Sequence, residues 1–113
     1  MPFINVKTNV SVSQDKADAV KSALGQAITT IPGKSESWLM VGIEPDYILY
    51  FQGSDSPAAI AEVSIFGGAS SSAYDTLTGR ISDILENALG ITQDRIYVRY
   101  TETENWGWNG SNF

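Results

Sequence analysis

The residue with the most unusual chemistry in this chain is Pro2, which directly follows Met1 and opens the apolar segment Phe3-Ile4. A small residue after the initiator usually allows the methionine to be trimmed, and the mature chain would then begin with a secondary amine on a rigid ring. An ordinary α-amino group has a pKa of about 7.7–8.0, and burial or a nearby cation lowers it toward neutrality, where a general base works best. Many chains that do no chemistry also begin Met-Pro, so the other residues must decide between a base and an ordinary terminus.

Two residue types that dominate protein catalysis are absent, because the chain contains no cysteine and no histidine. The missing cysteines exclude disulfides, thiolate nucleophiles and cysteine-based zinc sites. The missing histidines exclude the Ser-His-Asp mechanism and most transition-metal sites. We therefore expect no metal and no cofactor. A catalytic base would have to be a carboxylate, a lysine, a tyrosine or the terminal amine, which strengthens the case for Pro2.

Length and composition predict one soluble globular domain that spans residues 1–113. The chain is 42% hydrophobic and 18% charged, with a net charge of −6 and scattered basic residues, so no nucleic-acid partner is expected. No apolar run approaches the roughly 20 residues that span a bilayer, so no membrane partner is expected either. The N-terminus lacks the pattern of a secretory signal, which favours a cytoplasmic protein.

Hydrophobic spacing of three and four residues predicts two amphipathic helices, at residues 14–31 and 72–89. Ser13 is expected to cap the first helix, and Ser71 or Ser72 the second. Gly90 suits the position that follows the last turn of the second helix. Runs of β-branched and aromatic residues predict five strands, at residues 2–8, 38–44, 47–52, 58–66 and 95–101.

The predicted elements form the order β-α-β twice, which indicates a pseudo-twofold repeat. Two helices on one face of a four-stranded mixed sheet give a two-layer α/β sandwich. The apolar segment 47–52 is too hydrophobic for a bare sheet edge, which would invite pairing. The other face of the sheet is also expected to be apolar, which predicts a symmetric homo-oligomer with sites at its subunit boundaries; the residues assigned to that face are Trp38, Met40, Ile65, Tyr97 and Tyr100.

Several short motifs, in order and over the whole length of the chain, resemble the macrophage migration inhibitory factor (MIF) family of the tautomerase superfamily. They are Pro2-Phe3-Ile4, Thr8-Asn9-Val10, Gly33-Lys34, Asp94-Arg95-Ile96-Tyr97-Val98 and the C-terminal segment 105–113. The resemblance implies a homotrimer whose sheets wrap a central channel. It also implies three sites at subunit interfaces that convert the keto and enol forms of aryl pyruvates such as phenylpyruvate.

The same resemblance assigns roles to individual residues. Pro2 is similar to the family's catalytic base, and Lys34 to a lysine that pairs with the substrate carboxylate and helps keep the proline neutral. Val63 is similar in position to an isoleucine whose backbone N–H contacts the substrate, and Tyr97 to an interface tyrosine. Trp108 is expected to pack structurally. The remaining aromatic positions are expected to line the pocket or desolvate the proline; they are Phe3, Trp38, Trp106 and Phe113.

The chain departs from the family pattern at two places. The best-known members carry Cys-x-x-Cys where this chain has the segment 57–61 (Pro-Ala-Ala-Ile-Ala), which excludes thiol oxidoreductase activity. Arg99 stands where well-studied relatives have an asparagine. Its guanidinium could add a second clamp on a carboxylate, fill the pocket, or turn toward an acid such as Glu102.

Three functions remain open at this stage. The first is a phenylpyruvate-type tautomerase, an isomerase that acts on a small aromatic keto or enol carboxylate. The second is a cytokine-like signalling protein with a receptor partner, exported without a signal peptide, in which the pocket is incidental. The third is a related reaction on another carboxylated substrate that uses Arg99.

Overall fold

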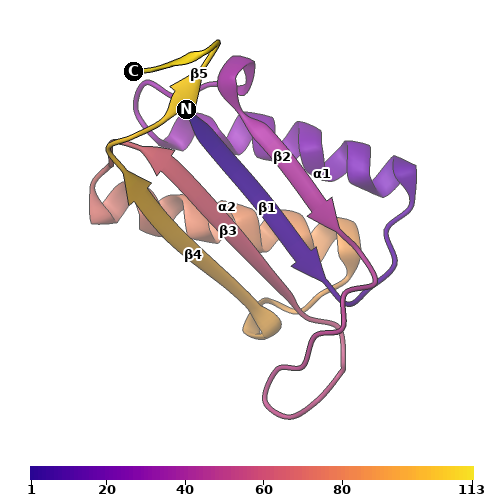
Figure 1. Ribbon diagram of the computed structural model, residues 1–113. Coiled ribbons are helices and arrows are strands. Elements are labelled where there is room, and N and C mark those ends of the chain that lie inside the picture. The colour runs from indigo at the N-terminus through magenta and orange to yellow at the C-terminus, as the bar shows by residue number, and fades with distance from the viewer.

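Two helices cover one face of a four-stranded sheet in the computed structural model, which describes residues 1–113 (Figure 1). The strand order is β2-β1-β3-β4, with β1 parallel to β2, β3 parallel to β4, and β1 antiparallel to β3. This arrangement confirms the predicted mixed sheet and its two β-α-β halves. The bounds are β1 Pro2–Thr8, α1 Gln14–Ala27, β2 Met40–Glu44, β3 Ala59–Phe66, α2 Ser71–Leu89 and β4 Ile96–Thr103.

The hydrophobic core lies between the sheet and the two helices. Alternate residues of β1 and β3 point toward the helices, as the period of two in a strand requires. Ile4 and Ile65 are fully buried on this side of the sheet, and Leu24, Leu77 and Ile81 meet them from the helices.

The helix boundaries agree with the predicted ones to within a few residues. Ser13 caps α1 by accepting a hydrogen bond from the backbone N–H of Lys16 at 3.3 Å. After Ala27 the chain continues as one 3₁₀ turn, Ile28–Thr30. Ser70 caps α2, one residue earlier than expected, and Gly90 adopts the predicted left-handed conformation after its last turn (φ 70°). Neither helix has the length and apolar character needed to cross a membrane.

The predicted strand at residues 47–52 is wrong, because this segment lies in the β2–β3 loop, residues 45–58, and forms only an isolated bridge between Phe51 and Ser54. A strand needs a neighbour to satisfy its backbone, and none is offered within the chain. Side chains supply partners instead: the Asn9 amide donates to the carbonyl oxygen of Leu49 at 3.3 Å, and the Arg95 guanidinium to that of Phe51 at 3.2 Å. Asn9 also holds the end of the loop. The Asn9 amide donates to the carbonyl oxygens of Asp55 and Ser56, both at 3.0 Å, and accepts from the N–H of Ala58 at 2.9 Å.

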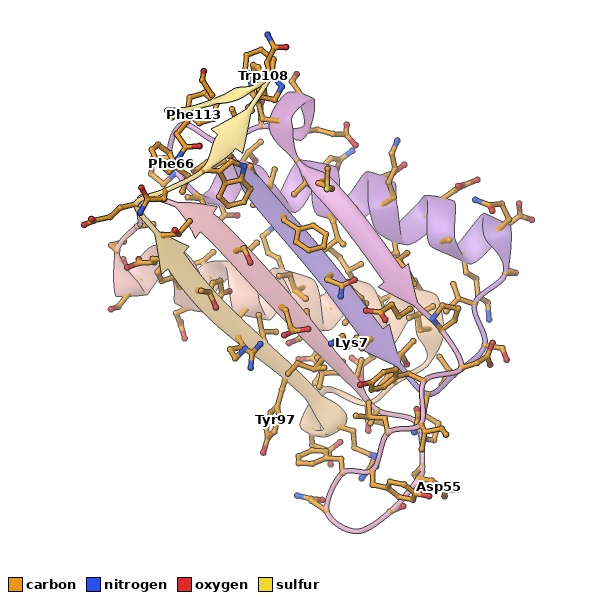
Figure 2. The ribbon with its side chains drawn as sticks, in the orientation of Figure 1. Lys7, Asp55, Phe66, Tyr97, Trp108 and Phe113 are labelled. Carbon is orange, nitrogen blue, oxygen red and sulfur yellow. The ribbon has the colours of Figure 1, made fainter.

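The open face of the sheet carries charge as well as apolar residues, which corrects the expected apolar face. Lys7 and Arg99 both pair with Glu62 there, and the Lys7 Nζ lies 3.2 Å from a Glu62 oxygen (Figure 2). Ile65 is fully buried toward the helices. Tyr100 also lies on the helix side, where its ring stacks on Tyr74 with centroids 4.5 Å apart. Side chains alternate between the two faces of a strand, so an error of one residue moves a side chain to the other face. This explains why Ile65 and Tyr100 lie on the helix side and not on the open face.

A turn before β2 and a C-terminal hairpin lie next to the N-terminus, at the top of Figure 1. Trp38, expected to open a strand, instead ends the 3₁₀ turn Glu36–Trp38 that precedes β2. The C-terminal segment folds into a hairpin of β5, Gly107–Trp108, and β6, Ser111–Asn112. Its turn residues Asn109 and Gly110 both have positive φ, the conformation that an Asn-Gly hairpin turn favours. The C-terminal hairpin and the turn before β2 therefore flank the start of β1.

Candidate active site

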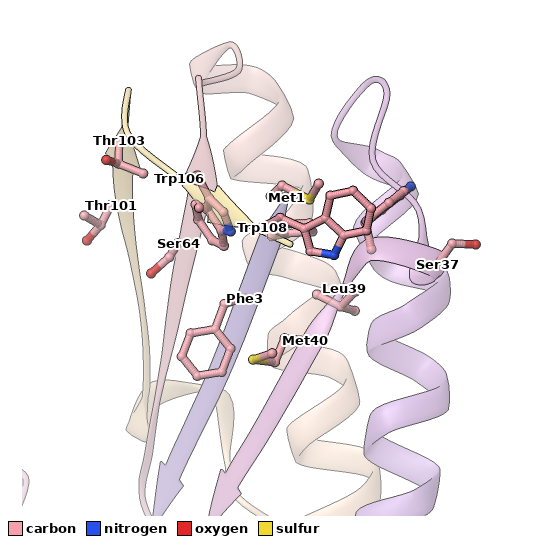
Figure 3. A pocket seen from close by; sticks show the side chains of 13 residues that line it. Met1, Phe3, Ser37, Leu39, Met40, Ser64, Thr101, Thr103, Trp106 and Trp108 are labelled. Carbon is pink, nitrogen blue, oxygen red and sulfur yellow. The ribbon is translucent and has the colours of Figure 1, made fainter. Parts of the chain in front are cut away.

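A pocket of about 800 Å³ opens at the start of β1, between the end of the sheet, the turn before β2 and the C-terminal hairpin. Figure 3 shows Trp106 and Trp108 next to Met1, with Phe3 and Met40 further along the sheet. Ser64, Thr101 and Thr103 provide hydroxyl groups along one side. The pocket thus combines an aromatic wall with a polar one, as small-molecule sites commonly do. Four of the predicted site residues line it, namely Pro2, Phe3, Trp38 and Trp106.

The start of the chain is held in place by backbone and side-chain contacts. Pro2 is buried and pairs with Ile65 in the antiparallel register of β1 and β3. The backbone N–H of Phe66 donates to the carbonyl oxygen of Met1 at 3.1 Å. The Lys34 ammonium donates to the carbonyl oxygen of Phe66 at 3.2 Å. Lys34, in the loop after α1, therefore lies close to the first residue, although it is not among the residues that line the pocket.

The environment at the first residue favours a neutral amine. Desolvation, together with hydrogen bonding and charge repulsion from Lys34, lowers the pKa of the Met1 α-amine from its ordinary value of 8.0 to about 6. Between these two pH values the unfolded chain holds the proton and the folded chain does not. The free energy of unfolding therefore rises as pH increases through this window, and the destabilisation is fully present below the folded-state pKa.

In molecules that retain Met1, we expect the rate at which the α-amine reacts with an acylating reagent to reach half of its maximum near pH 6. Mass spectrometry of the N-terminal peptide measures this rate across pH. In Lys34→Met, which removes the charge but keeps the length, the pKa should rise toward 8.0 without reaching it, because desolvation is the largest cause of the shift. A half-maximal rate near pH 8 in the unaltered chain would contradict the expectation.

Aromatic side chains from three parts of the chain meet at the pocket rim. Trp38 and Trp108 pack edge to face with ring centroids 5.1 Å apart, and Trp108 stacks parallel to Phe113 at 6.2 Å. Trp108, expected to pack structurally, lines the pocket and is 52% exposed. Phe113, expected at the pocket mouth, does not line it and lies against Phe66 at 5.6 Å. Of these two stacked side chains, Trp108 therefore lines the pocket, whereas Phe113 lies beside it.

Comparison with known proteins decides the family. The family profile described as "Macrophage migration inhibitory factor (MIF)" matches residues 1–113. The chain belongs to the MIF family. The macrophage migration inhibitory factor of Meriones unguiculatus is 34% identical over 118 aligned positions, which cover 100% of this chain and 99% of that protein.

Solved structures of MIF proteins share the fold. The chain superposes on Leishmania major MIF2 with a TM-score of 0.94 and 34% identity, over 100% of this chain and 97% of that one. The macrophage migration inhibitory factor of Toxoplasma gondii matches with a TM-score of 0.91 and 26% identity, over 98% and 99% of the two chains. The resemblance found in the sequence motifs is therefore confirmed over the whole chain.

One residue predicted from the MIF resemblance does not fit its predicted role. Val63 is 1% exposed, points toward the helices and lies within a strand that is paired on both sides, with Ile4 and with Tyr100. The backbone group beside the first residue belongs to Phe66 instead. The sequence offered no signal for this shift, because it depends on the register that places Pro2 opposite Ile65.

Two further predicted residues of this MIF family member lie away from the pocket. Figure 2 shows Tyr97 at the opposite end of the sheet from Trp108 and Phe113. Tyr97 is 60% exposed. The Arg99 guanidinium donates to Glu62 on the open face rather than to Glu102 or into the pocket. A single chain therefore does not bring Tyr97 or Arg99 together with Pro2.

Proposed function

We propose that this chain is a keto–enol tautomerase of aryl pyruvates, active in molecules from which Met1 has been removed, with the Pro2 nitrogen as general base. The observation that carries the proposal is the environment of the first residue. Desolvation, hydrogen bonding and charge repulsion from Lys34 lower the pKa of the Met1 α-amine, one residue before the proposed base, to about 6 at the edge of an aromatic pocket, and the same surroundings would act on the Pro2 amine. A base with a pKa near neutrality is both deprotonated and basic enough to accept a proton at physiological pH.

The proposed reaction is a proton transfer within the substrate. The neutral Pro2 amine takes a proton from the carbon next to the carbonyl, and the electron pair of that C–H bond forms the enol double bond while the carbonyl oxygen becomes negative. The proton then passes to that oxygen to complete the enol. In the reverse direction each step is retraced, so no cofactor or oxidant is consumed.

Two groups beside Pro2 have the chemistry to support this transfer. The Lys34 ammonium is a compact point charge that suits a carboxylate, and it already lies at the first residue. The Phe66 N–H donates to the Met1 carbonyl when Met1 is present. Removal of Met1 would release this donor to the substrate, and backbone donors aimed at a developing oxyanion are a large term in catalysis.

We further propose that the working form is a homotrimer in which Tyr97 completes the site of a neighbouring copy. Tyr97 is 60% exposed, and Ile48 and Tyr50 of the β2–β3 loop beside it are 85% and 67% exposed. Apolar side chains gathered at this end of the sheet indicate a surface that another chain covers. Trp38, Trp106 and Trp108 would then face the aryl ring of the substrate from within one chain.

The direct test measures phenylpyruvate enolisation by ultraviolet absorption, with the intact mass determined on the same sample. We expect the fraction of molecules that begins with Pro2 to account for all turnover. A trimmed, folded sample that enolises phenylpyruvate no faster than buffer would overturn the proposed function.

Lys34→Met is expected to raise KM for phenylpyruvate by roughly 10-fold to 100-fold, the range of a lost charge-assisted hydrogen bond worth about 1.5–3 kcal/mol. The matched control is Lys16→Met, in the first turn of α1, where the side chain is exposed. A substrate analogue without the carboxylate should show no such difference between wild type and Lys34→Met. An equal loss on both substrates would contradict the proposed pairing with the carboxylate.

A further inference from the structure

Arg95, immediately before β4, makes four side-chain hydrogen bonds outside the pocket. It stands at the end of the 3₁₀ turn Gln93–Arg95, and its guanidinium donates only to backbone carbonyls of the β2–β3 loop. Its bonds are to Pro57 at 2.9 Å, Ser56 at 3.0 Å, Ser54 at 3.1 Å and Phe51 at 3.2 Å. A planar fork of five N–H donors can reach four acceptors at once, which an ammonium group cannot do with the same geometry.

The same guanidinium also contacts the ring of Phe51. Its central carbon lies 5.3 Å from the Phe51 ring centroid, within the range of a cation–π interaction. Arg95 therefore contacts Phe51 in two ways: the guanidinium donates a hydrogen bond to the Phe51 carbonyl oxygen, and it lies over the Phe51 ring. The turn that follows Phe51 places Gln52 and Gly53 at positive φ, and the bonds to Ser54 and Ser56 hold the far side of that turn.

Phe51 in turn packs against Tyr97, with ring centroids 4.7 Å apart and planes tilted by 57°. The backbone of Tyr97 is set by its pairing with Ile60 in β3. Strand pairing does not set the orientation of a side chain that is 60% exposed, so the Tyr97 ring depends on its neighbours. Phe51 is the aromatic neighbour that restrains it within the chain.

We propose that Arg95 is a positioning residue for the reaction. It holds the β2–β3 loop so that Phe51 fixes the Tyr97 ring in the orientation that walls the pocket of a neighbouring copy. This inference rests on the proposed function, in which Tyr97 completes a neighbour's site. Arg95 itself touches neither the pocket nor the substrate, and acts through Phe51.

The test compares Arg95→Lys and Phe51→Leu with wild type in two measurements. The first is the steady-state kinetics of phenylpyruvate enolisation. We expect KM to rise by about threefold to tenfold in both variants, the range that an aromatic contact of 0.5–1.5 kcal/mol is worth, while kcat changes less than about twofold. The matched control is Arg80→Lys, because Arg80 also bonds across the chain, to Thr30 at 2.8 Å, but on the helical layer.

The second measurement does not depend on turnover. In protein labelled with 3-fluorotyrosine, the five tyrosines give ¹⁹F resonances, and Tyr97→Phe identifies that of Tyr97. We expect the Tyr97 resonance to shift and narrow toward that of a freely rotating ring in Arg95→Lys and in Phe51→Leu, and to stay unchanged in Arg80→Lys. This measurement distinguishes a failure of the positioning role from a failure of the proposed function, because it reports on the Tyr97 ring even if wild type proves inactive on phenylpyruvate.

Two results would overturn the positioning role. The first is an unchanged Tyr97 resonance in a folded Arg95→Lys sample, whatever the value of KM. The second is an equal fall of kcat and kcat/KM accompanied by dissociation of the assembly on size-exclusion chromatography, which would make Arg95 a purely structural residue. If Arg95→Lys does not fold, Phe51→Leu tests the same contact with all four guanidinium bonds retained, and a resonance unchanged in that variant would equally overturn the role.

Discussion

An alanine inserted between Met1 and Pro2 is expected to reduce phenylpyruvate enolisation by roughly 10²-fold to 10⁴-fold, the usual contribution of general acid–base catalysis. The insertion converts the Pro2 nitrogen into an amide, which has no basicity. It also pushes an extra residue into the place where Met1 now contacts Phe66 and Lys34. The rate is measured by ultraviolet absorption on samples whose N-terminus has been established by intact mass.

Pro2→Gly separates the loss of the ring from the loss of the amine. Glycine also permits trimming, so this variant keeps a terminal amine at the same place without the rigid ring, and its activity should lie between wild type and the insertion. Circular dichroism and size-exclusion chromatography check that the fold and the assembly persist. Full activity in the insertion variant would show that Pro2 is not the base.

Ile65→Ala is expected to lower the free energy of unfolding by about 2–5 kcal/mol, because the side chain is fully buried against the helices. The site would lose both transfer free energy and packing, since close-packed interiors relax only partly around a deletion. Denaturant unfolding followed by circular dichroism measures the change. Wild type and variant must be compared at one protomer concentration, because association shifts apparent stability.

Ile65→Val serves as the graded control, with an expected loss of about 0.5–1.5 kcal/mol. This pair of variants also tests which face of β3 carries Ile65, since the sequence pattern had assigned this residue to the open face. On that face, truncation away from other contacts would change stability by no more than about 0.5 kcal/mol. A loss that small in Ile65→Ala would contradict the burial of this residue.

Most elements of the fold could be predicted because local patterns specify them. The apolar spacing of Val20 and Leu24 in α1, and of Leu77 and Ile81 in α2, places one face of each helix on the core. Ser13 and Gly90 mark helix ends through their own backbone chemistry. These signals act over a few residues and need no knowledge of partners.

The errors arose where a segment depends on contacts that are distant in sequence. Tyr47 to Gln52 has the composition of a strand, but its backbone is satisfied by Asn9 and Arg95 within a loop. The resemblance to the MIF family assigned a backbone donor to Val63, whereas the register of β1 against β3 puts the backbone N–H of Phe66 next to the first residue. The register, which sets the residue that lies opposite each position, is a property of a pair of strands. A shift of one residue in register therefore cannot be recognised from the sequence of either strand alone.

The sequence by itself determined the chemical inventory of this protein. Because histidine and cysteine are absent, it left a carboxylate, a lysine, a tyrosine or the terminal amine as the possible base, and the resemblance to the MIF family then pointed to Pro2 and Lys34. Only the tertiary structure decided how these groups are arranged. It placed Lys34 at the first residue, Trp108 in the pocket, and Tyr97 at the far end of the sheet. The physical reason is that residue types determine which groups can carry a charge or transfer a proton. The pKa values and contacts of these groups depend on the strands and loops that pack around them.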